Sequence, residues 1–220
     1  MLRLYDHLSS GNGYKCRWLL TQLGHPFQRV EMDIDRGETR TPEFLALNPN
    51  GRIPMLRLAP GDFLAESNAI LRWLAEDTSF WPDNRRDKAA VLQWLFWEQY
   101  SHEPNIATAR FWITHKVAMD PERIHALIAK RENGHAALKL MERHLTGRDW
   151  FVGQNATIAD IALYAYTHVA EEGGFDLAPY PAIRDWLDRF AAQPNHIKIT
   201  DAVGTPVSVA DALTSERQGA

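Results

Sequence analysis

Residues 48–76, NPNGRIPMLRLAPGDFLAESNAILRWLAE, give the strongest indication of the fold. Two short apolar runs on either side of Pro60-Gly61 predict two strands joined by a turn, because Pro and Gly punctuate such runs. An amphipathic helix then begins near Ser67, a residue type favoured at the N-cap. The free N–H groups and the dipole at such a helix end favour an anion, so this segment predicts both structure and a candidate binding position.

The segments before it extend this pattern toward the N-terminus. YDHLSSGNGYKCRWLL, residues 5–20, predicts a strand, a polar loop and a helix with an apolar stripe. The alternating run at 27–34 predicts a second strand, and residues 42–49 predict a short helical turn. The order β-α-β-α-β-β-α predicts a small mixed sheet flanked by helices.

After Asp87 the strand pattern disappears. Long apolar-periodic segments predict four helices at 88–112, 121–145, 157–170 and 182–193. The first of these helices should kink at Pro104, and the second should begin at Pro121. We therefore expect four parts, namely an α/β domain at 1–78, a linker at 79–87, an all-α domain at 88–200 and a mobile or flap-forming tail at 201–220.

Composition limits the classes of partner. The 220 residues are 45% hydrophobic and 24% charged, with net charge −4, which is typical of a globular protein and suggests neither nucleic acid nor an anionic membrane. No apolar run approaches the roughly 18 residues of a membrane helix, and the N-terminal MLRLYDH predicts a strand rather than a signal peptide. The single cysteine, Cys16, excludes an internal disulfide and fits a cytoplasmic protein.

Two other types of site, a phosphate-binding loop and a metal site, are not predicted because their sequence motifs are absent. SSGNGYKC lacks the G-x-x-x-x-G-K-[ST] pattern of a phosphate-binding loop. SHEPN is not H-E-x-x-H, and the remaining histidines are widely spaced, so we expect no metal.

Three segments, in their order and spacing, resemble the cytosolic glutathione S-transferase superfamily. They are the strand–loop–helix with Ser10 and Asn12, NPNGRIP at 48–54 and AESNAILRWLAE at 65–76. NATIADIALY at 155–164 also resembles an N-capping segment of that family. The resemblance covers roughly residues 1–200. It implies a thioredoxin-like N-terminal domain, an all-helical C-terminal domain and a homodimer.

The resemblance implies a glutathione site in the N-terminal domain. Pro54 would be cis, so that the backbone of Ile53 pairs with the ligand peptide in β-like fashion. Glu66 and Ser67 would hold the amine and carboxylate of the γ-glutamyl group. Taken alone, the same residues also fit an ordinary turn and a plain helix cap.

Two arginines are candidates for the glycyl carboxylate of glutathione. Arg52 adjoins the implied cis-proline, and a guanidinium can bind a carboxylate bidentately. Arg40 can also reach a carboxylate, although its position departs from the family pattern. Surface arginines without a role remain an alternative.

The opening loop would activate the thiol of glutathione. A free thiol has a pKa near 8.5, so only about 3% is ionised at pH 7. The resemblance implies that Ser10, which precedes Lys15 in the first helical turn, is the activating hydroxyl. Asn12 is a second candidate, because an amide N–H₂ group also donates hydrogen bonds. Cys16 lies on the apolar stripe and is expected in the core.

The resemblance places the apolar second substrate between the two domains, against the first helices of the α domain. Tyr100, Asn105, Arg110 and Phe111 are the candidates by position. Arg110 would favour an electrophile that carries or develops negative charge.

The TIAD segment has a structural explanation. Thr157 can cap the next helix, and Asp160 can reach back to the Thr157 N–H, as in a capping box. We therefore expect Asp160 to stabilise the fold rather than to bind glutathione.

The expected function is that of a glutathione transferase. The protein would ionise glutathione and conjugate it to small hydrophobic electrophiles in detoxification, or use it to reduce a peroxide. The alternative is a non-catalytic member of the same fold that serves as a ligand carrier or an interaction scaffold.

Overall fold

The computed structural model describes residues 1–218, which form two compact units. The first contains residues 1–76 and 194–218, and the second contains residues 77–193. Residues 219–220 of the predicted tail lie outside the described part. Among the helices of the described residues, none is long and apolar enough to cross a membrane.

The first unit has a mixed five-stranded sheet in the order β4-β3-β1-β2-β5. β1 pairs in parallel with β2, and β2 pairs in parallel with β5, whereas β3 is antiparallel to both β1 and β4. Its elements are β1 (Leu2–Asp6), α1 (Gly11–Gln22), β2 (Phe27–Glu31), the 3₁₀ turn η1 (Glu38–Arg40), α2 (Pro42–Leu47), β3 (Met55–Ala59), β4 (Asp62–Ala65), α3 (Ser67–Leu74), β5 (Thr205–Val207) and α9 (Val209–Gln218).

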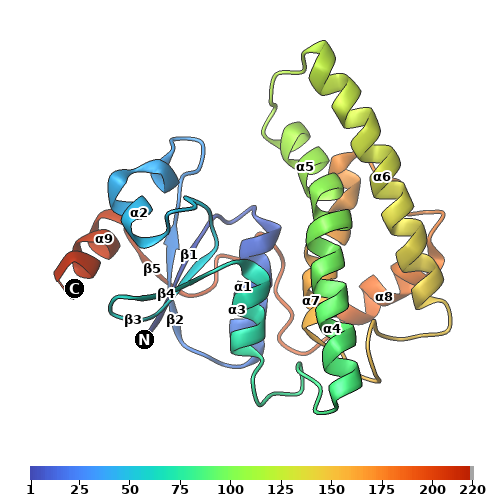
Figure 1. Ribbon diagram of the computed structural model, residues 1–220, viewed down its shortest axis with the longest axis horizontal. Helices are drawn as coiled ribbons and strands as arrows, with labels where there is room; N and C mark the ends of the chain where they lie inside the picture. The colour runs from blue at the N-terminus through green and yellow to red at the C-terminus, as the bar shows by residue number, and fades with distance from the viewer. Residues whose placement is uncertain (219–220) are drawn as a thin grey trace. The chain divides into compact units, whose positions relative to one another are not determined.

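Helices cover both faces of this sheet. α1 and α3 pack together on one face, and α2 and α9 lie on the other (Figure 1). On the second face, Tyr5, Phe44 and Met55 form a buried core with the small Ala212 of α9. The β-α-β-α-β-β-α order and the cis Ile53–Pro54 peptide bond confirm the predicted thioredoxin-like fold.

The predicted tail is instead an integral part of the first unit. β5 extends the sheet beside β2, and α9 buries Ala212 and Glu216. The sequence pattern is weak here because β5 has three residues and is mostly exposed, and because one of the residues that α9 buries is charged.

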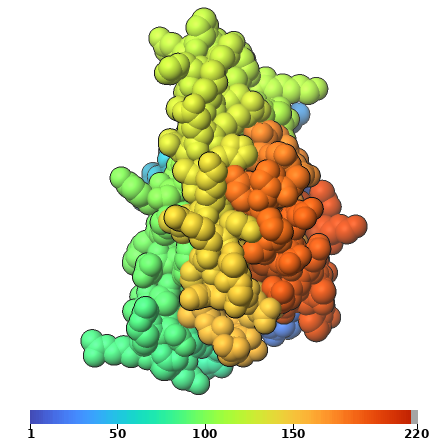
Figure 2. All heavy atoms as spheres, turned by 90° about the vertical axis from the view of Figure 1, so that its right-hand side faces the viewer, coloured from blue at the N-terminus to red at the C-terminus, as the bar shows by residue number. Residues whose placement is uncertain are grey.

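The second unit is entirely helical, which confirms the predicted all-α architecture. Figure 2 shows α6 along the middle of one face, and α6 packs against both α5 and α8. Its elements are α4 (Arg85–Trp97), the π-turn η2 (Glu98–His102), α5 (Glu103–Thr114), α6 (Pro121–Leu145), α7 (Ile158–Thr167), the 3₁₀ turn η3 (Ala170–Gly173) and α8 (Pro181–Ala191). Every residue of α7 is buried, as its apolar sequence predicts.

The first predicted helix of this unit continues through a π-turn, because the flanking residues keep helical backbone angles. The π-turn at Glu98–His102 joins α4 to α5, and Pro104 lies in the first turn of α5. Proline fits there because it lacks the N–H that the first turn leaves unpaired.

The capping box at the start of α7 is confirmed, and it is part of a larger buried network. Asp160 accepts hydrogen bonds from the Thr157 N–H at 2.8 Å, the Phe151 N–H at 3.0 Å and Trp186 Nε1 at 3.1 Å. Burial raises the pKa of Asp160 to about 6, and the hydrogen bonds from Phe151, Thr157 and Trp186 oppose that rise. Asp160 therefore links α7 to α8 and to the loop that precedes α7.

Candidate active site

Strand register brings three predicted site segments to one edge of the sheet. Tyr5 of β1 pairs with Met55 of β3, and Met55 pairs with Ala65 of β4. Because β1 runs antiparallel to β3, the loop that follows β1, the segment that precedes β3 and the segment that follows β4 emerge at the same edge. The opening loop, the cis Ile53–Pro54 bond and the start of α3 are therefore neighbours.

Ser10 is the N-cap of α1, with an extended backbone conformation. Its Oγ accepts a hydrogen bond from the Gly13 N–H at 3.2 Å. This contact uses an oxygen lone pair, so the Ser10 hydroxyl can still donate a hydrogen bond to a ligand. The turn also requires glycine at Gly13, since a Cβ there would lie 1.5 Å from Asp6 Oδ1.

Asn12 connects the N-terminal turns of α1 and α3. Its Oδ1 accepts from Ser67 Oγ at 3.1 Å and from Lys15 Nζ at 2.8 Å. The sequence predicted both Asn12 and Ser67 as site residues but gave no sign that they touch. Their contact ties the thiol-activating loop to the carboxylate-binding helix end that the resemblance implies.

The start of α3 differs from the prediction by one residue. Glu66, not Ser67, occupies the N-cap position, and Ser67 is the first helical residue. Glu66 has φ 69° and ψ 112°, a conformation rare for a residue with a Cβ, and such backbone outliers concentrate at functional sites. The Ser67 side chain is buried and turned toward α1, which frees the helix end from a side-chain cap.

The loop before β3 is held by a residue that the sequence analysis missed. Asn48 is buried, donates from Nδ2 to the Arg52 carbonyl at 2.8 Å and accepts from the Asn50 N–H at 3.2 Å. Gly51, at φ +61°, completes the turn. The NPNG sequence signals a turn, but it does not reveal that the first asparagine faces inward.

The two predicted arginines have different surroundings. Arg40 donates from Nη1 to the Asn50 carbonyl at 3.1 Å, so it supports the loop. Arg52 is exposed and follows Gly51 in that loop. Both guanidinium groups stay at the surface, and neither is buried in an ion pair.

A buried ion pair lies beneath α1. Arg17 Nε is 2.7 Å from Asp6 Oδ2, and both side chains are fully buried. Arg17 also donates to the carbonyls of Leu8 at 2.6 Å and Asp201 at 2.9 Å. Burial raises the pKa of Asp6 to about 6, against the lowering effect of Arg17. This pair anchors the helix that carries Ser10, and it was not predicted.

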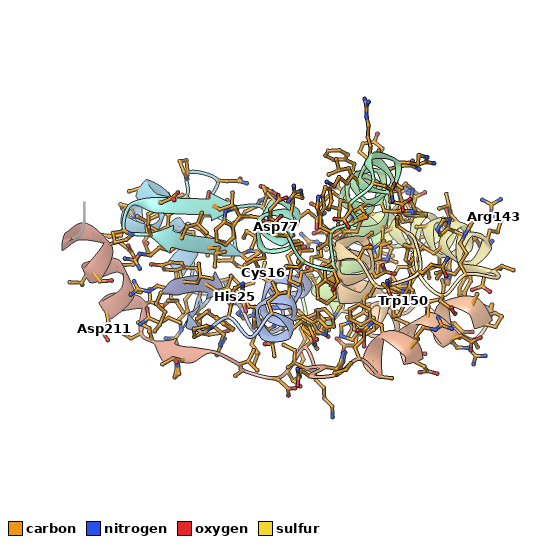
Figure 3. All side chains as sticks on the ribbon, turned by 90° about the horizontal axis from the view of Figure 1, so that it is seen from below. Cys16, His25, Asp77, Arg143, Trp150 and Asp211 are labelled. Carbon is orange, nitrogen blue, oxygen red and sulfur yellow. The ribbon has the colours of Figure 1, made fainter. Side chains whose placement is uncertain are left out.

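The other possible nucleophiles in this unit are inert. Cys16, labelled in Figure 3, is fully buried, and burial raises the pKa of its thiol. Tyr5 is also buried and donates to Glu216, and burial raises its pKa to about 12. The predicted core position of Cys16 is confirmed.

The family of the chain follows from sequence comparison. Residues 1–76 match the model of the glutathione S-transferase N-terminal domain, and residues 102–194 match that of the C-terminal domain. The chain belongs to the glutathione S-transferase superfamily. Disulfide-bond oxidoreductase YfcG of Escherichia coli K12 is 31% identical, over 83% of this chain and 87% of that protein.

Solved structures of the superfamily agree in fold. A glutathione S-transferase from Pseudomonas fluorescens Pf-5 has a TM-score of 0.88 and 46% identity, over 91% of this chain and 99% of that chain. Ure2p in complex with glutathione has a TM-score of 0.79 and 26% identity, over 90% of this chain and 92% of that chain.

The four residues predicted to line the second-substrate site do not lie together in one cluster. Tyr100 and Asn105 line a pocket of about 320 Å³ beside α6. Arg110 is largely buried and pairs with Glu172, Nε to Oε2, at 2.7 Å. Phe111 stacks on His115 with ring centroids 4.1 Å apart. The Glu172 carboxylate already partners Arg110, which weakens the prediction that Arg110 attracts an anionic electrophile.

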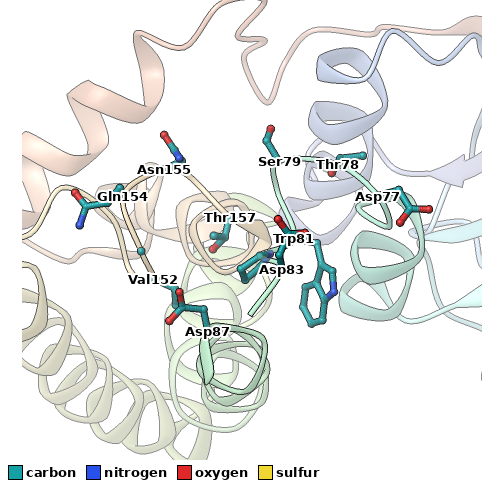
Figure 4. A pocket seen from close by; sticks show the side chains of 12 residues that line it. Asp77, Thr78, Ser79, Trp81, Asp83, Asp87, Val152, Gln154, Asn155 and Thr157 are labelled. Carbon is teal, nitrogen blue, oxygen red and sulfur yellow. The ribbon is translucent and has the colours of Figure 1, made fainter. Parts of the chain in front are cut away.

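A larger pocket of about 640 Å³ lies elsewhere in the second unit (Figure 4). Residues from the segments 77–83 and 152–157, together with Asp87, line it, and Asp77, Asp83 and Asp87 make its wall acidic. It contains none of the predicted site residues. Its size therefore does not identify it as the reaction site.

Proposed function

We propose that this protein binds glutathione in its first unit and ionises the thiol for addition to a small hydrophobic electrophile. The observation that carries the proposal is the convergence of Ser10, the Asn12–Ser67 contact and the cis Ile53–Pro54 bond at one sheet edge. A cytoplasmic setting belongs to the proposal, because a reducing compartment keeps glutathione in its thiol form.

Each group of glutathione has a candidate partner among the described residues. The backbone of Ile53 would pair with the peptide, and the first-turn N–H groups of α3 beside Ser67 would take the γ-glutamyl carboxylate. Glu66 would hold the amine. Arg52, with Arg40 beside it, would hold the glycyl carboxylate.

The chemistry requires the chain to favour a thiolate. Lowering the thiol pKa by about two units corresponds to about 2.7 kcal/mol of differential stabilisation. The Ser10 hydroxyl would donate a hydrogen bond to the thiolate sulfur, and the N-terminus of α1 would add its dipole. Conjugation then forms a carbon–sulfur bond, while the thiol proton passes to solvent and a substituted electrophile releases its leaving group.

Replacing Ser10 with alanine should raise the pKa of the bound thiol by about one unit or more, because one charge-assisted donor is lost. The measurement is the ultraviolet thiolate band of bound glutathione as a function of pH. Ser9→Ala, one position earlier in the loop, is the matched control and should leave the titration unchanged. If Asn12→Ala raises the pKa and Ser10→Ala does not, the roles of these two residues are reversed.

A second candidate reaction is glutathione-dependent disulfide reduction. It is favoured by the name of the E. coli relative, Disulfide-bond oxidoreductase YfcG. Cys16 is buried, so the attacking group would be the bound thiolate, which forms a mixed disulfide and expels the other sulfur as a thiolate. Parallel assays with 1-chloro-2,4-dinitrobenzene, cumene hydroperoxide and bis(2-hydroxyethyl) disulfide separate conjugation, peroxide reduction and disulfide reduction. Retention on glutathione resin without turnover in any assay would instead favour a carrier or scaffold.

The proposal includes a homodimer. Leu92, Phe96 and Tyr100 are exposed at i, i+4 and i+8 along α4 and the following π-turn, and Phe96 is 72% exposed. Large exposed apolar patches commonly mark interaction surfaces. Phe96→Asp should convert the dimer into a monomer in sedimentation velocity, whereas Ile128→Asp on α6 should not. A wild-type monomer would contradict this part of the proposal.

A further inference from the structure

Lys15 is a charged side chain in the interior of the first unit. It lies on α1 and is fully buried, which is rare for lysine because its ammonium group loses hydration. Its Nζ donates to Asn12 Oδ1 at 2.8 Å and lies 3.5 Å from Asn68 Oδ1. Both acceptors belong to the helix ends that form the candidate glutathione site, so the location of this charge matters for ligand binding.

The ammonium fixes the orientation of the Asn12 amide. A lysine ammonium group has donors and no acceptor, so only the amide oxygen of Asn12 can face it. Ser67 donates to that same oxygen at 3.1 Å. The Nδ2 group of Asn12 therefore points away from both Lys15 and Ser67.

The charges around Lys15 favour an anion. Neither α1 nor α3 has an acidic residue in its first turn, and both helices direct their positive dipole ends toward this region. Asp6 adjoins the first turn of α1 but is paired with Arg17 at 2.7 Å. Glu66 lies at the start of α3 and is exposed, so its charge is screened by solvent.

We propose that Lys15 is a positioning residue for the glutathione thiolate. It fixes the orientation of the Asn12 amide between the first turns of α1 and α3, and its buried charge favours the ionised thiol. This inference rests on the proposed function. It adds Lys15 as a buried residue that favours the thiolate without contacting the sulfur.

The test is the thiol titration of bound glutathione in Lys15 variants. Lys15→Met keeps the length of the side chain and removes the charge, and it should raise the thiol pKa by about one unit. Lys15→Arg keeps the charge and should stay closer to the wild type. Lys139→Met, on an exposed position of α6, is the control and should have no effect. Thermal unfolding of each variant verifies that it is folded, and Lys15→Gln replaces Lys15→Met if the latter does not fold.

A double variant distinguishes positioning from a general loss of stability. If Lys15 acts partly through Asn12, Lys15→Met and Asn12→Ala together should raise the thiol pKa by less than the sum of the single effects. An unchanged thiol pKa in folded Lys15→Met that still binds glutathione would overturn the inference and leave the proposed function intact. A wild-type protein that does not lower the thiol pKa would instead contradict the proposed function itself.

Discussion

Replacing Asp160 with alanine should lower the free energy of unfolding by about 4 kcal/mol, because it removes the only carboxylate of a buried network. The carboxylate accepts from the N–H groups of Phe151 and Thr157, from the Thr157 hydroxyl and from Trp186 Nε1. Truncation leaves these donors inside the protein, where water does not replace the lost acceptor. Each buried donor without a partner costs roughly 1–3 kcal/mol, so the total exceeds that of an ordinary helix cap.

Urea unfolding of the second unit, followed by tryptophan fluorescence, measures the effect. Asp160→Asn keeps one acceptor oxygen and should be intermediate. Asp185→Ala, which removes an exposed carboxylate from α8, should change stability by less than about 0.5 kcal/mol. Glutathione affinity should change little in folded Asp160→Ala. Unchanged thermal stability in that variant would count against the capping role.

Replacing Glu216 with alanine should lower the free energy of unfolding of the first unit by about 3–5 kcal/mol. Glu216 Oε1 lies 2.6 Å from Arg3 Nη1, and Oε2 lies 2.7 Å from Arg57 Nε. Tyr5 donates to Oε1 at 3.2 Å. The Glu216 side chain and its partners are largely buried, so the substitution leaves two guanidinium groups in the interior without their shared carboxylate.

Loss of this pairing should also release α9 from the sheet. Limited proteolysis would then cleave the chain after residue 204 faster in Glu216→Ala than in the wild type. Thr214→Ala is the matched control, since Thr214 is exposed on the same helix. Glu216→Gln keeps the shape and should restore part of the protection. Equal cleavage rates in Glu216→Ala and the wild type would show that the ion pairs do not hold the helix.

Local signals made the regular parts of the fold predictable. Pro121 and the apolar period that follows it predicted α6, which the structure places at Pro121–Leu145. The Thr157–Asp160 spacing predicted the capping box, because both partners lie within one helical turn. The cis-proline came from the family resemblance rather than from the chemistry of the segment alone.

What the sequence did not reveal depends on partners that are distant along the chain. Nothing in the sequence marks Lys15, Arg17 or Glu216 as buried, since a charged residue is rarely fully buried. Their acceptors come from other strands and helices, and Arg3 lies 213 residues from Glu216. The shift of the α3 cap from Ser67 to Glu66 likewise follows from the contact between Ser67 and Asn12.

The central claim is that Ser10, Asn12 and Ser67, at one edge of the sheet, belong to a site that ionises the thiol of glutathione. The most direct test is the ultraviolet titration of glutathione bound to the wild-type protein. The proposed site predicts a thiol pKa about two units below the free value near 8.5, with the thiolate dominant at pH 7. Glutathione that binds but titrates at its free value, or that does not bind, would contradict the claim.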